Sequence, residues 1–158
     1  MSLRIERLRD QPGVAEQLAV WHVREWGHLF HGWDEAAAQA EFAAQALSDD
    51  LPATWLAFHD DALIGSISAL LEDSPHLRDF PGPWLASFYI APEYRGQGAA
   101  QALMNAAAMA VAGYGHRAWY LFTPAHAAYY QRHGWQTLAE RSVQGEPVAV
   151  MRQDFSAV

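Results

Sequence analysis

The chain has 158 residues, a formal net charge of −8 and an apolar share of 51%. That length and composition exclude a disordered chain and predict one folded domain over residues 1–158. The sequence contains neither cysteine nor lysine, which excludes disulfides, thiolate nucleophiles, a Walker phosphate-loop lysine and a Schiff-base lysine.

The first elements in chain order are a strand and two helices. Residues 3–8 alternate between apolar and polar side chains, as in a half-buried strand. Apolar residues from Val14 to Leu29 recur at helical spacing and predict a helix. Asp34 is a suitable N-cap for a second helix over residues 35–47.

A hairpin and a buried strand follow the two helices. Residues 54–58 and 62–71 are rich in strand-forming side chains and flank a turn at Asp60 and Asp61. Residues 84–90 form a mostly apolar run, which is typical of a central strand.

The C-terminal part predicts two helices that alternate with strands. An alanine-rich helix over residues 98–112 precedes a strand over residues 117–122, and Thr123 is the expected N-cap of a short helix. Strands over residues 135–143 and 147–154 complete the pattern. The order βααβββαβαββ predicts an α/β (α+β) fold built on one mixed central sheet.

Residues 94–100, Tyr-Arg-Gly-Gln-Gly-Ala-Ala, join the predicted central strand to the alanine-rich helix. The first N–H groups of a helix have no internal partner, and the helix dipole favours an anion there. Gly96 and Gly98 let the backbone approach a phosphate closely, and Arg95 adds a guanidinium fork. The loop therefore predicts a pyrophosphate cradle, with an ordinary strand–helix turn as the alternative. A dinucleotide-binding fingerprint fits less well, because Gln101 stands where that motif has its third glycine.

Two segments of the chain resemble motifs of the GNAT superfamily of acetyl-CoA-dependent N-acetyltransferases. Arg95, Gly98 and Ala100 match that family's coenzyme A signature, Arg-x-x-Gly-x-Gly/Ala. Residues 88–92 look like the family's strand before this loop, and residues 129–135 resemble its aromatic-Tyr-x-x-x-Gly-Phe segment. The predicted elements are similar in order to the family's along essentially the whole chain, so the resemblance implies a single-domain GNAT fold.

The resemblance implies acetyl-CoA as co-substrate and suggests roles for individual positions. Backbone groups of Phe88 and Ile90 are expected to hold the pantetheine arm, and the N–H of Tyr89 to polarise the thioester carbonyl. Tyr130 matches the tyrosine that often protonates the departing thiolate. Thr123 stands where the family often has asparagine, and a hydroxyl cannot replace both ends of an amide. The expected acetyl-CoA contacts are Phe88, Tyr89, Ile90, Arg95, Gly96, Gln97, Gly98, Ala99, Ala100, Thr123 and Tyr130.

Direct transfer to an amine needs a base, because an unperturbed amine with a pKa of about 10 is protonated at neutral pH. Glu25 interrupts the apolar stripe of the first helix, and His126 lies four residues before Tyr130, on the same helix face. Either side chain could accept or relay the proton, or simply meet solvent. The wider set of candidates is Glu25, Glu72, Asp73, Asp79 and His126.

The stretch between the first two helices is rich in aromatic and histidine side chains. In the GNAT family this junction usually forms part of the acceptor site. Trp26, Phe30 and Trp33 could wall an apolar pocket, hold a cation by cation–π contact, or simply pack. His28 and His31 lack a placed carboxylate or cysteine, so we expect no metal.

These features together predict an acetyl-CoA-dependent N-acetyltransferase, in which the amine attacks the thioester directly in a ternary complex. The acidic balance favours a small cationic acceptor and no nucleic-acid partner. No apolar run is long enough for a membrane span and no signal-peptide core is visible, so we expect a cytoplasmic protein. A homodimer is compatible with the sequence. Two alternatives stay open: a non-catalytic sensor that binds coenzyme A or acyl-CoA, and an acyltransferase for longer acyl chains.

Overall fold

The computed structural model describes residues 2–47 and 49–155. Within them the α-helices and strands follow the expected order βααβββαβαββ. The strands are β1 (Leu3–Arg7), β2 (Ala53–His59), β3 (Ala62–Leu70), β4 (Trp84–Ile90), β5 (Ala118–Thr123), β6 (Gln136–Val143) and β7 (Glu146–Asp154). The helices are α1 (Ala15–Trp26), α2 (Glu35–Gln45), α3 (Ala99–Gly113) and α4 (Ala127–Arg132). None of these helices is long and apolar enough to cross a membrane.

One mixed sheet holds the strands in the order β1-β2-β3-β4-β5-β7-β6. Neighbouring strands pair antiparallel, except β4 and β5, which run parallel. β4 and β5 share the register pair Trp84 and Tyr120, supported by a 2.8 Å hydrogen bond from the Tyr120 N–H to the Pro83 carbonyl. Because that pair lies at the very start of β4, the sheet opens between the two strands toward their C-terminal ends.

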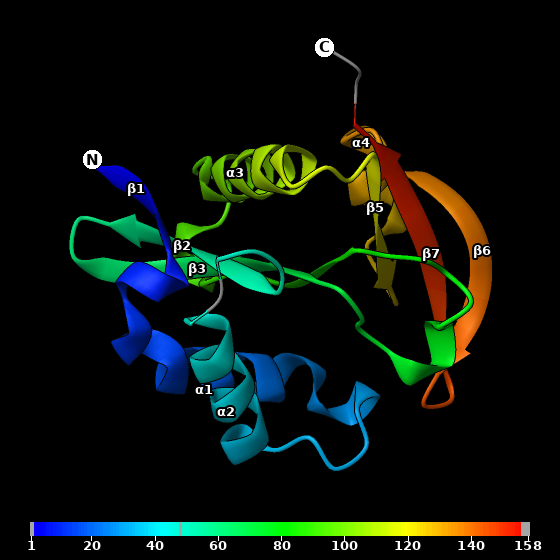
Figure 1. Cartoon of the computed structure of the whole chain (residues 1–158), viewed down its shortest axis with the longest axis horizontal. Helices are drawn as coiled ribbons and strands as arrows, with labels where there is room; N and C mark the ends of the chain where they lie inside the picture. Colours follow the sequence, from blue (N-terminus) through cyan, green and yellow to red (C-terminus); the bar gives the residue numbers. More distant parts are fainter. Residues whose placement is uncertain (1, 48, 156–158) are drawn as a thin grey trace.

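Helices cover both faces of the sheet (Figure 1). α3 lies on one face of β2 and β3, whereas α1 and α2 lie on the other face. β5, β7 and β6 stand together at the right of Figure 1, away from the half of the sheet formed by β1, β2 and β3. The gap between β4 and β5 is therefore bordered by helices from both layers.

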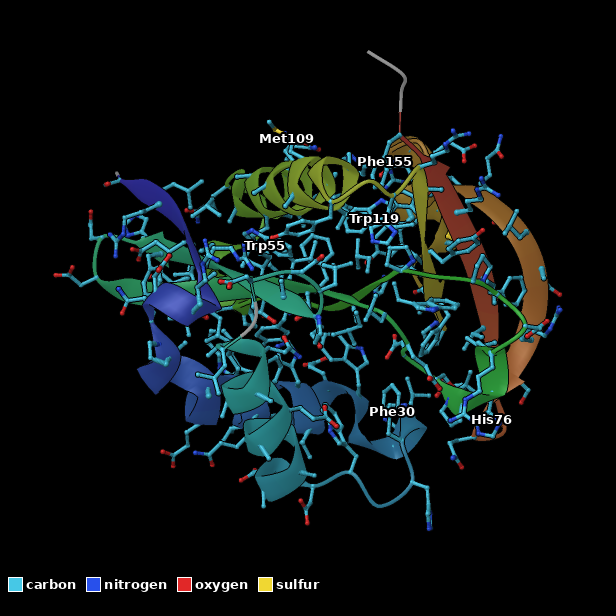
Figure 2. The ribbon with its side chains drawn as sticks, in the orientation of Figure 1. Phe30, Trp55, His76, Met109, Trp119 and Phe155 are labelled. Carbon is cyan, nitrogen blue, oxygen red and sulfur yellow. The ribbon has the colours of Figure 1, made fainter. Side chains whose placement is uncertain are left out.

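The largest core cluster lies beneath α3 and joins the two halves of the sheet. Leu103, Ala107 and Val111 are four residues apart, so they share one face of α3, and all three are fully buried. They pack in one cluster with Trp55 of β2 and Trp119 of β5, whose side chains fill the space below the helix in Figure 2. Alanine on this face lets α3 approach the sheet closely.

The opposite face of the sheet carries polar side chains that α1 and α2 bury. Ser66 and Ser68 of β3 are two residues apart and point to this face, because side chains alternate along a strand. Thr54 of β2 hydrogen-bonds to both Gln45 of α2 and Ser68. His22 of α1 lies 3.0 Å from the Ser66 hydroxyl. These contacts satisfy polar groups that would otherwise cost free energy when buried.

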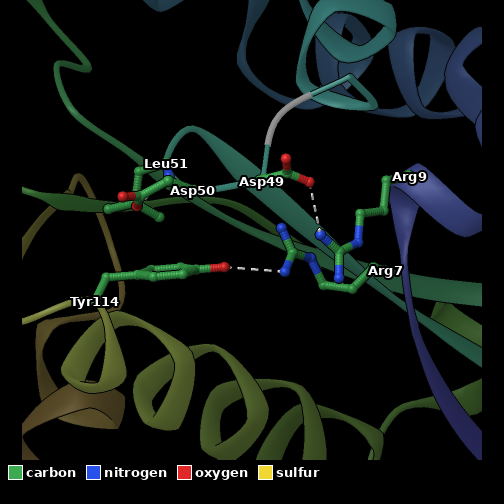
Figure 3. Close-up of polar contacts among 6 residues, drawn as sticks. All are labelled: Arg7, Arg9, Asp49, Asp50, Leu51 and Tyr114. Carbon is green, nitrogen blue, oxygen red and sulfur yellow. Dashed lines mark hydrogen bonds and ion pairs between the residues drawn. The ribbon is translucent and has the colours of Figure 1, made fainter.

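Two arginines tie the N-terminal segment to distant parts of the chain (Figure 3). Arg7, the last residue of β1, donates a 3.0 Å hydrogen bond to the hydroxyl of Tyr114, directly after α3. Its guanidinium carbon also lies 5.1 Å from the ring centroid of Trp55. Arg9 pairs with Asp49, before β2, at 3.2 Å. These contacts hold the edge strand β1 against α3 and the segment that enters β2.

The start of α4 differs from the sequence prediction. Thr123 is not the N-cap, since the helix begins at Ala127 and His126 occupies the N-cap position. The Thr123 Oγ1 accepts a 3.0 Å hydrogen bond from the His126 N–H, and so stabilises the turn that leads into the helix. The Tyr130 N–H still donates to the His126 carbonyl at 3.2 Å, so these two residues remain one helical turn apart.

Candidate active site

The opening between β4 and β5 leads into a cavity of about 1310 Å³. The second half of β4 and the segment that follows β5 line its middle. The glycine loop lines it on the α3 side of the sheet, and the α1–α2 junction and the residues after β3 line it on the other side. The cavity thus passes through the gap in the sheet and connects the two helical layers.

A β-bulge in β4 interrupts its pairing with β3 beside this cavity. Ser68 pairs with Ala86, but Ser66 pairs with Tyr89, so β4 contains one extra residue at this point. Ser87 lies in the bulge and has a φ of 51°, in the left-handed region. The bulge therefore shifts by one residue the alternating direction of the backbone N–H and C=O groups along β4.

The bulge decides which backbone groups of β4 face the gap. Alternate residues of an antiparallel strand direct their N–H and C=O groups to the same neighbour. Ala91 donates a 2.8 Å hydrogen bond to Ile64 of β3, so Tyr89, two residues earlier, also faces β3. Phe88 and Ile90 consequently direct their N–H groups toward β5, where the strands have diverged. The Tyr89 N–H, which the sequence predicted would polarise the thioester carbonyl, therefore faces β3 and not the gap.

The glycine loop presents unpaired N–H groups to the same cavity. Gly96 and Gly98 have φ values of 76° and 95°, and a Cβ atom on either would meet no atom within 4 Å. Gly98 is the N-cap of α3, and its carbonyl accepts the first helical hydrogen bond from the Ala102 N–H at 3.1 Å. The N–H groups of residues 99–101 therefore have no partner within the helix. This arrangement suits an anionic group such as a pyrophosphate.

Arg95 and Gln97 fold back onto the end of β4 and the turn η5 (Pro92–Tyr94). The Arg95 Nε donates a 2.8 Å hydrogen bond to the Ile90 carbonyl, and its guanidinium carbon lies 5.6 Å from the Tyr89 ring centroid. Gln97 Nε2 donates to the Glu93 carbonyl at 3.2 Å. Arg95 borders the cavity in this position, whereas Gln97 does not.

Most of the expected acetyl-CoA contacts are brought together by the fold. The cavity lining includes Phe88, Tyr89, Ile90, Arg95, Gly96, Gly98, Ala100, Thr123 and Tyr130. Ala99, in contrast, points its side chain into the core beneath α3 and is buried.

Tyr130 lies in the wall of the cavity between Phe88 and Trp135, with ring centroids 6.5 and 5.9 Å away. Burial raises the pKa of its phenol, and Tyr129 adds to this effect. The phenol is therefore protonated at neutral pH and can donate a hydrogen bond. None of the described residues accepts one from it, so the hydroxyl is free to meet a group inside the cavity.

An aromatic cluster, Trp26, Phe30, Trp33 and Phe122, lines the part of the cavity beside α1 and α2. The Phe30 ring centroid lies 5.4 Å from that of Trp33 and 6.3 Å from that of Phe122. Figure 2 shows Phe30 rising from the α1–α2 junction toward the β5 half of the sheet. These rings form an apolar wall that can contact both an alkyl chain and a cation.

Two carboxylates, Glu41 of α2 and Asp73 after β3, lie in the same part of the cavity. The Trp33 Nε1 donates a 3.1 Å hydrogen bond to Glu41, which partly offsets the rise that burial causes in the pKa of this carboxyl. Burial and, to a smaller extent, the charge of Glu41 together raise the pKa of Asp73 to about 7. Asp73 can therefore exchange a proton near neutral pH.

The other carboxylate candidates are placed less favourably. Glu25 lines the cavity but is exposed. Glu72 borders the cavity, and its carboxylate pairs with Arg78. Asp79 lies outside the lining and pairs with Arg141 at 3.1 Å.

The histidine candidates lie near the edge of the cavity. His126 is exposed there. The His28 Nε2 lies 3.0 Å from the Glu146 carboxylate, which links the α1–α2 junction to the β6–β7 hairpin. Among residues 2–47 and 49–155, no three histidine, aspartate or glutamate side chains gather as a metal site.

Sequence reasoning missed two polar residues of this region, Glu41 and His22. Glu41 directly precedes the buried Phe42, so the helical pattern alone marks it as a flank of α2 with no distinctive signal. His22 follows Leu18 by four residues on the buried stripe of α1, and both are fully buried. A histidine on an apolar stripe is the signal that could have identified it.

The fold is similar to that of solved acetyltransferases whose low sequence identities support the fold alone. A GNAT-family acetyltransferase from Streptococcus pneumoniae shares 22% identity at a TM-score of 0.69, over 98% of this chain and 100% of that one. An aminoglycoside 6'-acetyltransferase type Ii shares 17% identity at a TM-score of 0.70, over 98% and 97%. The PaiA N-acetyltransferase of Thermoplasma acidophilum, solved in complex with coenzyme A, shares 17% identity at a TM-score of 0.68, over 98% and 100%.

A comparison with curated protein sequences found no match. The model of the acetyltransferase (GNAT) family, in contrast, matches residues 15–135. The matched span begins with α1 and ends after α4, so it includes the β4 bulge, the glycine loop and Tyr130. The chain therefore belongs to the GNAT family of acetyltransferases, which use acetyl-CoA.

Proposed function

We propose that this acetyltransferase transfers the acetyl group of acetyl-CoA to a primary amine of a small cationic molecule, with both substrates bound at once. The observation that carries the proposal is the single cavity through the β4–β5 gap. It joins an anion-binding glycine loop to an aromatic pocket that contains two carboxylates. Each end therefore suits one substrate, and the thioester would meet the amine between them.

The acetyl-CoA end uses backbone groups more than side chains. The N–H groups of residues 99–101, with the flexible backbone at Gly96 and Gly98, suit the pyrophosphate. The pantetheine arm would add to the free edge of β4 as an extra strand, bonded to Phe88 and Ile90. An N–H of this edge would also stabilise the negative charge that develops on the thioester oxygen.

The acceptor end suits an ammonium group. Glu41 and Asp73 supply negative charge, and the aromatic cluster supplies ring faces and apolar area. The negative net charge of the chain also favours the approach of a cation. These features favour an amine whose ammonium is attached to an apolar or further cationic body.

In the proposed reaction Asp73 takes a proton from the bound ammonium, and the neutral amine attacks the thioester carbon. The new C–N bond forms, the C–S bond breaks, and the departing sulfur takes a proton from Tyr130. The nitrogen of the new amide loses its second proton to water, which returns a proton to the Tyr130 phenolate, while Asp73 releases the first proton to solvent. A cysteine acyl-enzyme is excluded because the chain contains no cysteine.

The test is thiol release from acetyl-CoA with a panel of monoamines, polyamines, amino acids and aminoglycosides. We expect at least one cationic amine to raise the rate well above the rate without acceptor. Asp73→Asn should lower kcat/KM for that amine by about 10²-fold, because the amide cannot take the proton. Asp79→Asn is the matched control on the same β3–β4 connection, and it should keep the activity of the wild type.

Other outcomes would overturn specific parts of the proposal. A preference for neutral or anionic acceptors would contradict the cationic class, and full activity of Asp73→Asn would exclude Asp73 as the base. Acetyl-CoA binding without transfer to any amine would support the sensor instead. A higher kcat/KM with a longer acyl-CoA than with acetyl-CoA would support an acyltransferase for longer acyl chains.

A further inference from the structure

His22 is a fully buried histidine that the proposed reaction does not use directly. α1 lies beneath the half of the sheet that contains β3 (Figure 1), and the His22 Nε2 lies 3.0 Å from the Ser66 hydroxyl of that strand. Its ring stacks on Trp26 at a centroid distance of 5.1 Å and an interplanar angle of 12°. The His22 ring also meets the ring of Tyr89 of β4 edge to face, with a centroid distance of 6.1 Å and an interplanar angle of 82°. His22 therefore touches both the acceptor wall and the strand that would hold the thioester.

The hydrogen bonds of His22 have a defined direction. The Ser66 hydroxyl donates a 3.2 Å hydrogen bond to the Ser87 carbonyl. A hydroxyl has a single hydrogen, so the His22 Nε2, 3.0 Å from the Ser66 Oγ, must carry the proton and donate. The Nδ1 is then unprotonated, and no described residue hydrogen-bonds to it. Burial lowers the pKa of His22 to about 3, so the ring remains neutral and its role is that of a fixed donor.

The acceptor at the end of this chain of hydrogen bonds is the bulge of β4. Ser87, whose carbonyl accepts the bond from Ser66, lies between the register pairs Ser66–Tyr89 and Ser68–Ala86 and has no register partner in β3. Its φ of 51° is an unfavourable conformation for a residue with a side chain. The Ser66 hydroxyl compensates by satisfying this carbonyl from the neighbouring strand.

The bulge determines which N–H groups the thioester can reach. Tyr120 donates to Pro83, so residues 83 and 85 face β5 before the bulge. Regular alternation would bring Tyr89 to that side. The extra residue instead brings Phe88 and Ile90 to the open edge.

We propose that His22 and Ser66 are positioning residues for acetyl transfer, because they hold the Ser87 carbonyl and thereby the register of β4 that aims the Phe88 and Ile90 N–H groups at the thioester. This inference rests on the proposed function, since it needs a thioester to lie along β4. The stacking of His22 on Trp26 also fixes the acceptor wall relative to the same bulge.

The test compares variants that break the chain of hydrogen bonds with variants that keep it. Ser66→Ala removes the hydroxyl, and His22→Phe removes the donor while keeping a ring that can stack on Trp26. Ser66→Thr keeps the hydroxyl. Ser68→Ala is the matched control, because it removes another buried hydroxyl of β3 that bonds to Thr54 rather than to the bulge.

Two measurements separate positioning from general damage. Steady-state kinetics with the best amine give kcat and KM, and calorimetry gives Kd for acetyl-CoA and for coenzyme A. Ser66→Ala and His22→Phe should lower kcat by roughly tenfold to a hundredfold and abolish any preference for acetyl-CoA over coenzyme A, with a much smaller rise in Kd for coenzyme A, whose pantetheine arm lies on the same strand edge. Ser66→Thr should keep most of kcat, and Ser68→Ala should lower only the melting temperature.

Each contrary result has a distinct meaning. If the wild type transfers acetyl groups but Ser66→Ala and His22→Phe behave like Ser68→Ala, the positioning role is wrong and the proposed function stands. A parallel loss of kcat and of coenzyme A binding would also overturn the role, because it indicates a disrupted site. If His22→Phe does not fold, the comparison of Ser66→Ala with Ser66→Thr decides whether the positioning role holds. Failure of the wild type to bind acetyl-CoA would overturn the proposed function and this inference together.

Discussion

At the scale of single residues, the Tyr130 hydroxyl is the group whose removal should separate chemistry from binding. Tyr130→Phe keeps the ring between Phe88 and Trp135 but removes the proton donor. We expect kcat to fall by about 10²-fold, with little change in the KM for acetyl-CoA. Tyr114→Phe is the control, since that hydroxyl bonds to Arg7 far from the cavity and should affect stability alone. Thiol-release kinetics check both variants, and an unchanged kcat for Tyr130→Phe would exclude proton donation.

The carboxylate pair makes a prediction about pH. A base must be deprotonated to act, so kcat/KM for the acceptor should fall as the pH drops through the pKa of Asp73, about 7. Glu41→Gln removes the charge that raises this pKa, so the acid limb of the profile should move to lower pH. Glu35→Gln changes the net charge equally at the exposed start of α2 and should leave the limb in place. If the acid limb of the pH profile stays at the same pH in Glu41→Gln, the limb reports the titration of a group other than Asp73.

At the scale of elements, the start of α3 depends on a glycine. Gly98 has a φ of 95°, and a Cβ there would meet no atom within 4 Å, so Gly98→Ala acts through backbone strain and not through a clash. We expect a loss of about 1–2 kcal/mol in the free energy of unfolding. The KM for acetyl-CoA should also rise, because the loop that cradles the pyrophosphate shifts. Gly113→Ala, at the other end of the same helix and without a positive φ, is the control and should leave both quantities near those of the wild type.

At the scale of the whole molecule, the core beneath α3 connects the two halves of the sheet. Leu103 is completely buried in the cluster that contains Trp55 and Trp119. Leu103→Ala should lower the free energy of unfolding by about 2–5 kcal/mol. Met109→Ala, on the exposed outer face of α3 (Figure 2), should change it by less than about 0.5 kcal/mol. Urea unfolding followed by tryptophan fluorescence and by circular dichroism checks both variants, and two separate transitions would show that the halves unfold independently.

This shared core supports the proposal that residues 1–158 form one domain. The solved acetyltransferases named above align over 98% of this chain and over 97–100% of their own length, which agrees with one unit. A single coincident unfolding transition would support the proposal further.

Local patterns in the sequence were sufficient for the order of elements. Two runs of strand-forming residues around Asp60 and Asp61 predicted the β2–β3 hairpin, and Gly96 and Gly98 predicted the turn into α3. Boundaries were less certain where side-chain chemistry was ambiguous. Thr123 resembled an N-cap, but its hydroxyl accepts a hydrogen bond from the His126 N–H in the turn that directly precedes α4.

The sequence by itself determined the fold class, the glycine loop and the candidate Tyr130, because each depends on neighbours within a few residues of the chain. Only the tertiary structure decided that Asp73 and Glu41 share a pocket and that His22 reaches the β4 bulge. The bulge itself was also invisible in the sequence, and it directs the N–H groups of Phe88 and Ile90, rather than that of Tyr89, to the open edge of β4. The physical reason is that burial, pKa and strand register depend on groups far apart in the chain, which no local periodicity records.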